Sequence, residues 1–251
     1  MTWQLQTPLD AIIFDCDGTL STIEGIDELA IKNGVEHQVK ALTEEAMGKT
    51  GINHIMYKNR LDLVKPTREQ VIALGMTYYT HRAPDLEGVL AVLQRLNKTL
   101  YIVSAGLTPA VTIFGKLLKI PEANIFAVGI EFDDRGHFLD FSHQSPLVMR
   151  EGKRLLITQV KTSNSEVGFI GDGLNDYVAA DLVTRFVGYG GSYYRENIAA
   201  LCQYYIKKSS MAPLLPLLLT KQEQQELLPE ETALYQKGLR AIQEKEVLVP
   251  R

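Results

Sequence analysis

The sequence predicts an α/β protein whose core is a doubly wound parallel sheet with a helical cap inserted into it. Two observations predict this fold. Short, almost continuously apolar runs alternate with amphipathic stretches, which is typical of parallel strands covered by helices on both faces. One long stretch, residues 22–84, interrupts that alternation, because it contains helical patterns but no convincing strand. It is therefore expected to be an insertion between the first and second core strands.

Four apolar runs are expected to form buried strands of the sheet, and a fifth run is a weaker candidate. They are Ala11–Asp15, Leu100–Ser104, Glu166–Gly171, Arg185–Gly188 and, as the weaker one, Gln203–Lys207. Residues 125–141 are instead expected to form a β-hairpin with Asp134-Arg135-Gly136 at its turn.

Helix starts are indicated at two places. Thr108 is expected to be an N-cap with Pro109 in the first helical position, and Thr67 with Gln70 forms a capping-box pattern. Lys221–Glu246 is polar and helix-prone, which predicts a terminal helix or helical hairpin. The expected division is a core domain of residues 8–21 and 85–210, a helical cap of residues 22–84, and a C-terminal helical extension of residues 211–251.

Composition argues against several classes of partner. Lys and Arg number 26 against 30 Asp and Glu, so the formal net charge is −4, and a mildly acidic chain suits neither nucleic acid nor anionic membranes. No signal peptide is recognisable, and no apolar run reaches the ~20 residues of a membrane-spanning helix. Two cysteines make no disulfide framework. The expectation is a cytoplasmic protein, either a monomer or a homodimer.

The richest motif is IIFDCDGTL, Ile12–Leu20. Asp15 and Asp17 stand at the end of a predicted buried strand, where ligands of open α/β sheets bind. Carboxylates this close do not both ionise easily unless a cation neutralises them or one keeps a proton. One of them could attack phosphorus while the other carries a proton. The alternative for this motif alone is an ordinary loop start, since Asp-Gly is common in turns.

A second acidic motif, GDGLND, follows the run EVGFI. Asp172 and Asp176 would supply hard oxygen ligands suited to Mg²⁺. The alternative is an acidic loop whose Asp176 favours the start of the following helix.

Ser104 ends another predicted strand, and Ala105 and Gly106 follow it just before a helix start. A hydroxyl and free backbone N–H groups at that edge suit a phosphate, although a plain strand-to-helix turn has the same composition. Lys153 begins a helical pattern, and such lysines are most often simply exposed.

Taken together and in this order, the four elements resemble the signature of the haloacid dehalogenase superfamily of phosphatases, which have a Rossmann-like core. The resemblance implies that Asp15 is the nucleophile, Asp17 the acid/base and Lys153 the residue that neutralises phosphoryl charge. It implies that Ser104, with Ala105 and Gly106, binds phosphate. Mg²⁺ would be held by Asp172, Asp15 and the Asp17 carbonyl, with Asn175 and Asp176 supporting that site.

Within residues 22–84, the segments around Glu24, Glu45–Gly48, Arg60 and Lys65–Val71 are similar to the helical cap of phosphoserine phosphatases. The resemblance implies that Glu24 faces a substrate amine, that Arg60 faces a carboxylate, and that Met47 contacts the substrate. Arginine suits carboxylates because its planar fork can donate two parallel hydrogen bonds. The alternative is that Glu24 and Arg60 are exposed helix charges.

The chain departs from that family at several positions. Gly18 stands where serine is usual, Ala105 replaces a glycine, and Asn53 falls near an expected cap aromatic. The resulting hypothesis is a phosphatase of phosphoserine or a similar small phosphorylated metabolite. Two alternatives stay open: a phosphatase or phosphotransferase for another small metabolite, and a catalytically inactive binding module.

Overall fold

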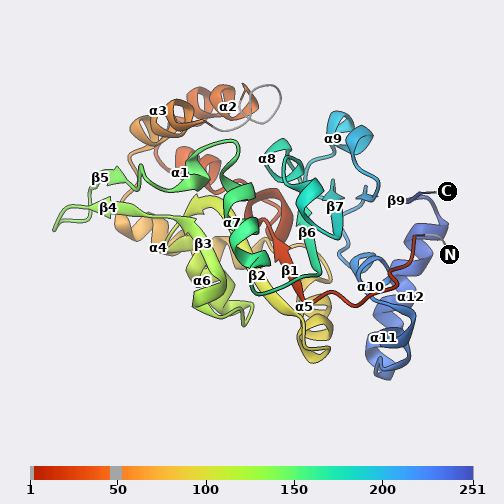
Figure 1. The fold of residues 1–251 in the computed structure, drawn as a ribbon. Helices are drawn as coiled ribbons and strands as arrows, with labels where there is room; N and C mark the ends of the chain where they lie inside the picture. Colours follow the sequence, from red (N-terminus) through yellow and green to blue (C-terminus); the bar gives the residue numbers. More distant parts are fainter. Residues whose placement is uncertain (1–2, 46–52, 251) are drawn as a thin grey trace.

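The computed structural model describes residues 3–45 and 53–250. Its central feature is a seven-stranded sheet with the order β3-β2-β1-β6-β7-β8-β9 (Figure 1). Because β1 lies between β2 and β6, the chain winds outward in both directions, which confirms the predicted doubly wound sheet and its inserted cap. The strands are β1 (Ala11–Phe14), β2 (Thr99–Leu107), β3 (Ile125–Val128), β6 (Val167–Gly171), β7 (Arg185–Tyr189), β8 (Tyr205–Ile206) and β9 (Val247–Leu248).

The three inner strands β1, β6 and β7 are buried along their whole length. Their runs lack the alternation of a half-exposed strand because helices cover both faces of the sheet. The covering helices include α5 (Leu86–Arg95), α6 (Ala110–Leu117) and α7 (Gly152–Lys161), and the shorter helices α8 (Leu174–Tyr177) and α9 (Glu196–Leu201) follow later strands. Helix α6 begins at Ala110 with Pro109 before it, so the prediction of Thr108 as N-cap is wrong by one position.

Within the described residues, four helices lie between β1 and α5 in the sequence. They are α1 (Gly25–Lys32), α2 (Glu36–Glu45), α3 (His54–Val64) and α4 (Arg68–Thr80), and Figure 1 shows α1 to α3 gathered at one end of the sheet. The predicted capping box is present at α4. Thr67 accepts from the backbone N–H of Gln70, and the side chain of Gln70 accepts from the N–H of Thr67 at 2.9 Å.

The two connections between these helices and the sheet run side by side. Ser21 and Arg82 form an antiparallel bridge. The N–H of Thr22 donates to His81 O at 2.8 Å, and the N–H of Ala83 donates to Leu20 O at 2.9 Å. The first residues after β1 form the tight turn η1 (Cys16–Leu20), which brings the chain to this paired connection.

The predicted hairpin over residues 125–141 is wrong in its first part. Ile125–Val128 forms β3, which pairs in parallel with β2 and extends the main sheet. Within this stretch, the antiparallel pair consists of β4 (Ile130–Phe132) and β5 (Phe138–Phe141), with the predicted turn between them. An apolar run without alternation is typical of a strand in a parallel sheet rather than of a hairpin with one exposed face.

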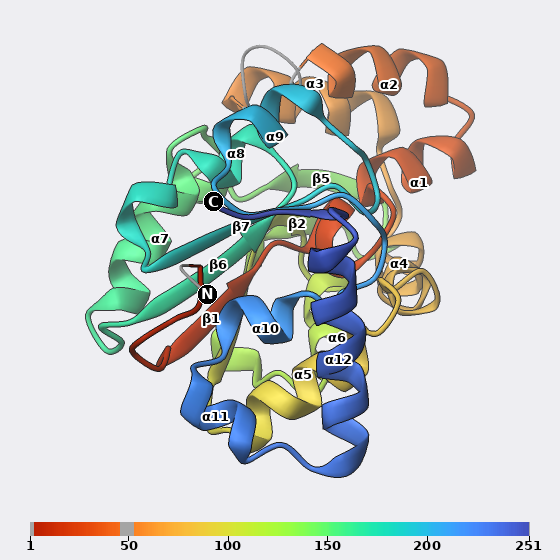
Figure 2. The same cartoon turned by 90° about the vertical axis from the view of Figure 1, so that its right-hand side faces the viewer.

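The C-terminal segment is helical as predicted, with one addition. It contains α10 (Leu214–Leu218), α11 (Lys221–Gln225) and α12 (Pro229–Gln243), which Figure 2 shows beside α5. The chain then forms β9, which pairs antiparallel with β8 and was not predicted. Among the residues that the structure describes, no helix is long and apolar enough to cross a membrane.

Candidate active site

The predicted site residues meet at the carboxyl ends of the strands. Asp15 follows β1, Asp172 follows β6, and Ser104 lies in the second half of β2. Their side chains border a cavity of about 60 Å³ or lie next to it, beneath helices α1, α3 and α4. This edge is where β1 separates the two directions of winding, the usual position of a binding site in such sheets.

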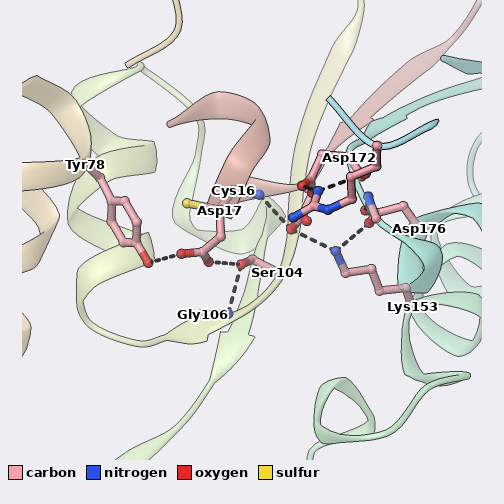
Figure 3. Close-up of polar contacts among 11 residues, drawn as sticks. Cys16, Asp17, Tyr78, Ser104, Gly106, Lys153, Asp172 and Asp176 are labelled. Carbon is pink, nitrogen blue, oxygen red and sulfur yellow. Dashed lines mark hydrogen bonds and ion pairs between the residues drawn. The ribbon is translucent and has the colours of Figure 1, made fainter. Parts of the chain in front are cut away.

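Lys153 is buried between two carboxylates rather than exposed. Its Nζ lies 2.8 Å from Asp15 Oδ1 and 2.6 Å from Asp176 Oδ1. Figure 3 shows the contact between Lys153 and Asp176. Burial alone would lower the pKa of Lys153, but the two carboxylates raise it overall, so the ammonium stays charged. Helix α7 begins at Gly152, which places Lys153 in its first turn and directs it toward the strand ends.

Three carboxylates form a buried cluster that suits a cation. Oxygen atoms of Asp15, Asp172 and Asp176 lie within 4.8 Å of one another. Burial raises the pKa of Asp15 well above its usual range, and burial raises the pKa of Asp172 to about 6. A divalent cation would relieve the repulsion among these groups, and carboxylate oxygens are the ligands that Mg²⁺ prefers. The residues present therefore fit a divalent cation.

Asp176 lies both at the start of a helix and within the carboxylate cluster, the two placements considered for it in the sequence. Its Oδ2 accepts from the N–H of Gly173 at 3.0 Å and so caps the first turn of α8. Its Oδ1 pairs with Lys153. The helix-start interpretation and the site interpretation are thus compatible.

Gly18 allows the turn after Asp17 to pass close to the carboxylate cluster. Its φ is +68°, a left-handed conformation that favours glycine. A Cβ atom at this position would lie 2.6 Å from Asp172 Oδ2. A serine here would require the turn or Asp172 to move.

Asp17 points away from the other carboxylates, toward the cap helices and β2. Its Oδ1 accepts from the hydroxyl of Tyr78 at 2.7 Å and from the N–H of Gly25 at 2.6 Å. Its Oδ2 accepts from the hydroxyl of Ser104 at 3.3 Å. Figure 3 shows this line of contacts from Tyr78 through Asp17 to Ser104.

The last part of β2, with Ser104, Ala105 and Gly106, is held by the core and by the cap. The N–H of Gly106 donates to Ser104 Oγ at 2.9 Å. The hydroxyl of Tyr57, on α3, donates to the carbonyl oxygen of Ala105 at 2.9 Å. Asn175, Ala105 and Gly106 all border the cavity.

Glu24 and Arg60 are buried beside the cavity, at 8% and 5% exposure, rather than exposed on helices. Within the described part of the chain, Glu24 Oε1 and Arg60 Nε have no hydrogen-bond partner. Burial, followed by the charges of Asp17 and Asp172, raises the pKa of Glu24 well above its usual range. Met47, the third predicted cap contact, lies outside the described residues.

Three residues at the site were not predicted from the sequence: Arg195, Tyr57 and Tyr78. The guanidinium of Arg195 donates to Asp172 Oδ2, lies 3.1 Å from Asp172 O, and lies 3.8 Å from Glu24 Oε1. Arg195 follows β7, so its place after a predicted strand is a signal that could have identified it. The two tyrosines lie in apolar faces of cap helices, and nothing in the sequence distinguishes them from core residues.

Comparison with known proteins gives a consistent result. A sequence model of haloacid dehalogenase-like hydrolases matches residues 9–182. The phosphoserine phosphatase of Bos taurus is 32% identical over 199 residues, or 78% of this chain and 88% of that protein. The chloroplastic phosphoserine phosphatase of Arabidopsis thaliana is 31% identical over 207 residues, or 80% of this chain and 69% of that protein. A phosphoserine phosphohydrolase-like protein from Francisella tularensis has the same fold, with a TM-score of 0.74 at 24% identity over 82% of this chain and 100% of that one.

Proposed function

Since the chain belongs to the haloacid dehalogenase-like hydrolases, we propose that it is a magnesium-dependent phosphomonoesterase that forms an aspartyl-phosphate on Asp15. The observation that carries this proposal is Lys153, buried with its ammonium between Asp15 and Asp176. A buried cation beside a strand-end carboxylate costs desolvation energy, and that arrangement suits a site where a phosphate dianion must approach a negatively charged nucleophile.

In the first step, a carboxylate oxygen of Asp15 attacks phosphorus and the bond from phosphorus to the ester oxygen breaks. Asp15 Oδ1 accepts from the N–H of Cys16 and pairs with Lys153, which leaves Oδ2 to attack. Asp17, as the acid, gives its proton to the leaving oxygen. Ser104 and the neighbouring N–H groups would bind the other phosphoryl oxygens.

In the second step, water attacks the phosphorus of the aspartyl-phosphate and gives a proton to the Asp17 carboxylate. The bond between phosphorus and the Asp15 oxygen then breaks, which releases inorganic phosphate and restores the starting charges. Lys153 stays protonated throughout and balances charge on Asp15 and the phosphoryl group.

Asp15, Asp172 and the backbone carbonyl of Asp17 would hold Mg²⁺, with Asp176 and Asn175 in support. When bound, the ion would neutralise charge on the phosphoryl oxygens and the carboxylates. The buried carboxylate cluster and the raised pKa of Asp172 support this assignment.

The proposed substrate is phosphoserine or a similar small zwitterionic phosphate. Glu24 and Arg60 border the same cavity as Asp15, and each has a buried polar atom without a hydrogen-bond partner among the described residues. Such atoms are costly unless a ligand completes their bonding. A substrate amine beside Glu24 and a carboxylate beside Arg60 would do so. The relatives in Bos taurus and Arabidopsis thaliana are named phosphoserine phosphatases, which supports the same substrate.

We also propose the predicted domain division, with the cap at residues 22–84, the core at 8–21 and 85–210, and the extension at 211–251. The paired connections at Ser21 and Arg82 support the cap boundaries. A cytoplasmic location is proposed as well, and the free thiols of Cys16 and Cys202 are compatible with a reducing compartment.

The test is phosphate release in Mg²⁺ from phosphoserine, an alkyl phosphate without either charge, and an aryl phosphate. We expect phosphoserine to be turned over fastest. Arg60→Ala should lower kcat/KM for phosphoserine by about 30-fold or more, because it leaves the substrate carboxylate unpaired in a closed site at a cost of roughly 2–5 kcal/mol. The same variant should leave the aryl phosphate nearly unchanged.

Two different failures are distinguishable in this experiment. Equal turnover of phosphoserine and the alkyl phosphate, with equal losses in Arg60→Ala, would reject the phosphoserine assignment and favour another small phosphorylated metabolite. Absence of phosphate release from every substrate in Mg²⁺ would reject hydrolysis and favour the binding-module alternative.

A further inference from the structure

The peptide bond between Ala105 and Gly106 is held from both sides by different parts of the molecule. Its carbonyl oxygen accepts from Tyr57 on cap helix α3, and its N–H donates to Ser104 Oγ on β2, both at 2.9 Å. In a trans peptide the carbonyl and the N–H point in opposite directions within one plane. A donor that fixes the carbonyl therefore fixes the direction of the N–H.

The same line of contacts continues to the proposed acid/base. Ser104 Oγ accepts from Gly106, so its own hydrogen is available to Asp17 Oδ2, 3.3 Å away. Figure 3 shows Gly106, Ser104 and Asp17 in this order. Every donor in the series points the same way, from the Tyr57 hydroxyl through the peptide and the Ser104 hydroxyl to Asp17.

Tyr57 is rigidly placed for this contact. The residue is 5% exposed, and its ring centroid lies 5.1 Å from that of Phe141 on β5. The guanidinium carbon of Arg60, one turn further along α3, lies 5.8 Å from the centre of the tyrosine ring. Burial raises the pKa of the Tyr57 hydroxyl, so it remains protonated and serves as a donor.

We propose that Tyr57 is a positioning residue that couples the docking of cap helix α3 to the orientation of Ser104 and Asp17. The inference rests on the proposed phosphatase function, in which Ser104 binds phosphate and Asp17 transfers protons. When α3 is docked, the Ala105 carbonyl is fixed and Ser104 Oγ is held between the Gly106 N–H and Asp17 Oδ2, where its one hydroxyl hydrogen points to Asp17 until a phosphoryl oxygen binds. When α3 moves away, the peptide is free to rotate, and both groups lose that direction. Chemistry is then favoured only with the cap in place.

The test compares Tyr57→Phe with Tyr79→Phe. Both remove one phenolic hydroxyl and one hydrogen bond, but Tyr79 donates to Glu87 on the surface, away from the cavity. We expect Tyr57→Phe to lower kcat about 3- to 10-fold for phosphoserine and aryl phosphate alike, the value of one neutral hydrogen bond. Tyr79→Phe should leave kcat unchanged. Hydrogen exchange of the Gly106 amide, followed by NMR in the free protein, should be faster in Tyr57→Phe alone.

A double-mutant cycle with Ser104→Ala separates positioning from a general structural role. If Tyr57 acts through Ser104, Tyr57→Phe has little further effect on kcat in the Ser104→Ala background. Additive effects, equal kcat values in Tyr57→Phe and Tyr79→Phe, or unchanged Gly106 exchange would each overturn the proposal. Failure of the phosphatase function itself would be visible first in the wild-type protein, as absence of turnover, and the exchange measurement does not depend on turnover.

Discussion

At the scale of single residues, the site is defined by how charges are distributed among six side chains, four of them buried and two, Asp17 and Arg195, half-buried. Asp15 and Asp176 share the ammonium of Lys153, while Asp172 is paired with Arg195. Asp17 instead accepts three neutral hydrogen bonds. Two carboxylates separated by a single residue thus have different surroundings, as the proposed roles of Asp15 as nucleophile and Asp17 as proton carrier require.

The first prediction at this scale concerns Asp15→Asn. The amide keeps the size of the side chain and can still accept from the N–H of Cys16, but it removes the attacking charge. We expect phosphate release to fall by at least ~10³-fold while the protein stays folded, because a principal catalytic group is lost. Steady-state turnover, with circular dichroism as the folding control, measures this. Turnover within tenfold of wild type would contradict Asp15 as nucleophile.

At the scale of elements, the C-terminal helices are fastened to the sheet by a buried ion pair. Lys98, just before β2, pairs with Glu223 of α11 and donates to Leu9 O at 2.8 Å. Glu223 Oε2 also accepts from the N–H and hydroxyl of Thr220 at the start of α11. The pair therefore connects two strand starts with a helix far along the chain.

Lys98→Met is expected to lower the free energy of unfolding by about 3–5 kcal/mol, because it leaves the Glu223 carboxylate buried without its cation. The double variant Lys98→Met/Glu223→Gln should recover part of that loss. Urea denaturation measures both. Lys116→Met is the matched control, since the Lys116–Glu122 pair is exposed and should matter little. Equal stability of Lys98→Met and the control would show that the buried pair contributes nothing.

Elements and motifs were predictable from the sequence where the signal is local. The runs around Asp15, Ser104 and Asp172 end at the same sheet edge because parallel strands all finish there. The contact of Tyr57 with Ala105 joins residues 48 positions apart, and that of Tyr78 with Asp17 joins residues 61 apart. A tyrosine in an apolar helix face gives no sign of which distant backbone group its hydroxyl will meet.

Strand β9 and the misassigned hairpin were unpredictable for a related reason. Val247–Leu248 is too short for a strand signal and exists because β8 leaves an edge to be paired. Ile125–Val128 pairs with β2 rather than with the next strand, a choice that depends on neighbours in space. Local patterns therefore predicted where the inner strands lie along the chain and which acidic motifs follow them, while edge pairing and cap contacts depended on the assembled fold.

At the scale of the whole molecule, metal binding should be visible in the folding equilibrium. A ligand that binds only the folded chain stabilises it by about 2.7 kcal/mol at 100 times its Kd, which corresponds to a rise in Tm of roughly 5–10 °C for a chain of this size. We expect that rise with Mg²⁺ and its reversal with EDTA, which should also abolish activity. Differential scanning calorimetry measures the change.

Asp172→Ala should lose most of this stabilisation at the same Mg²⁺ concentration, because a hard divalent ion depends on few carboxylate ligands. Potassium chloride at matched ionic strength controls for general screening of charge. Equal Tm increases in wild type and Asp172→Ala, or full turnover in excess chelator, would place magnesium elsewhere or exclude it from the reaction.

The paired connections at Ser21 and Arg82 restrict how the cap can move. A body tied by one flexible link can translate and turn about three axes, whereas two links that are hydrogen-bonded to each other act as one short ribbon. Sliding and twisting would break those bonds, and α4 packs against α6 of the core, so we expect any displacement of the cap to be a swing about the ribbon. A cap that swings about a single axis closes along the same path by which it opens. Tyr57, Arg60 and Glu24 would then return together to the same positions over the strand ends each time the cap closes. The cap would not have to sample other orientations first.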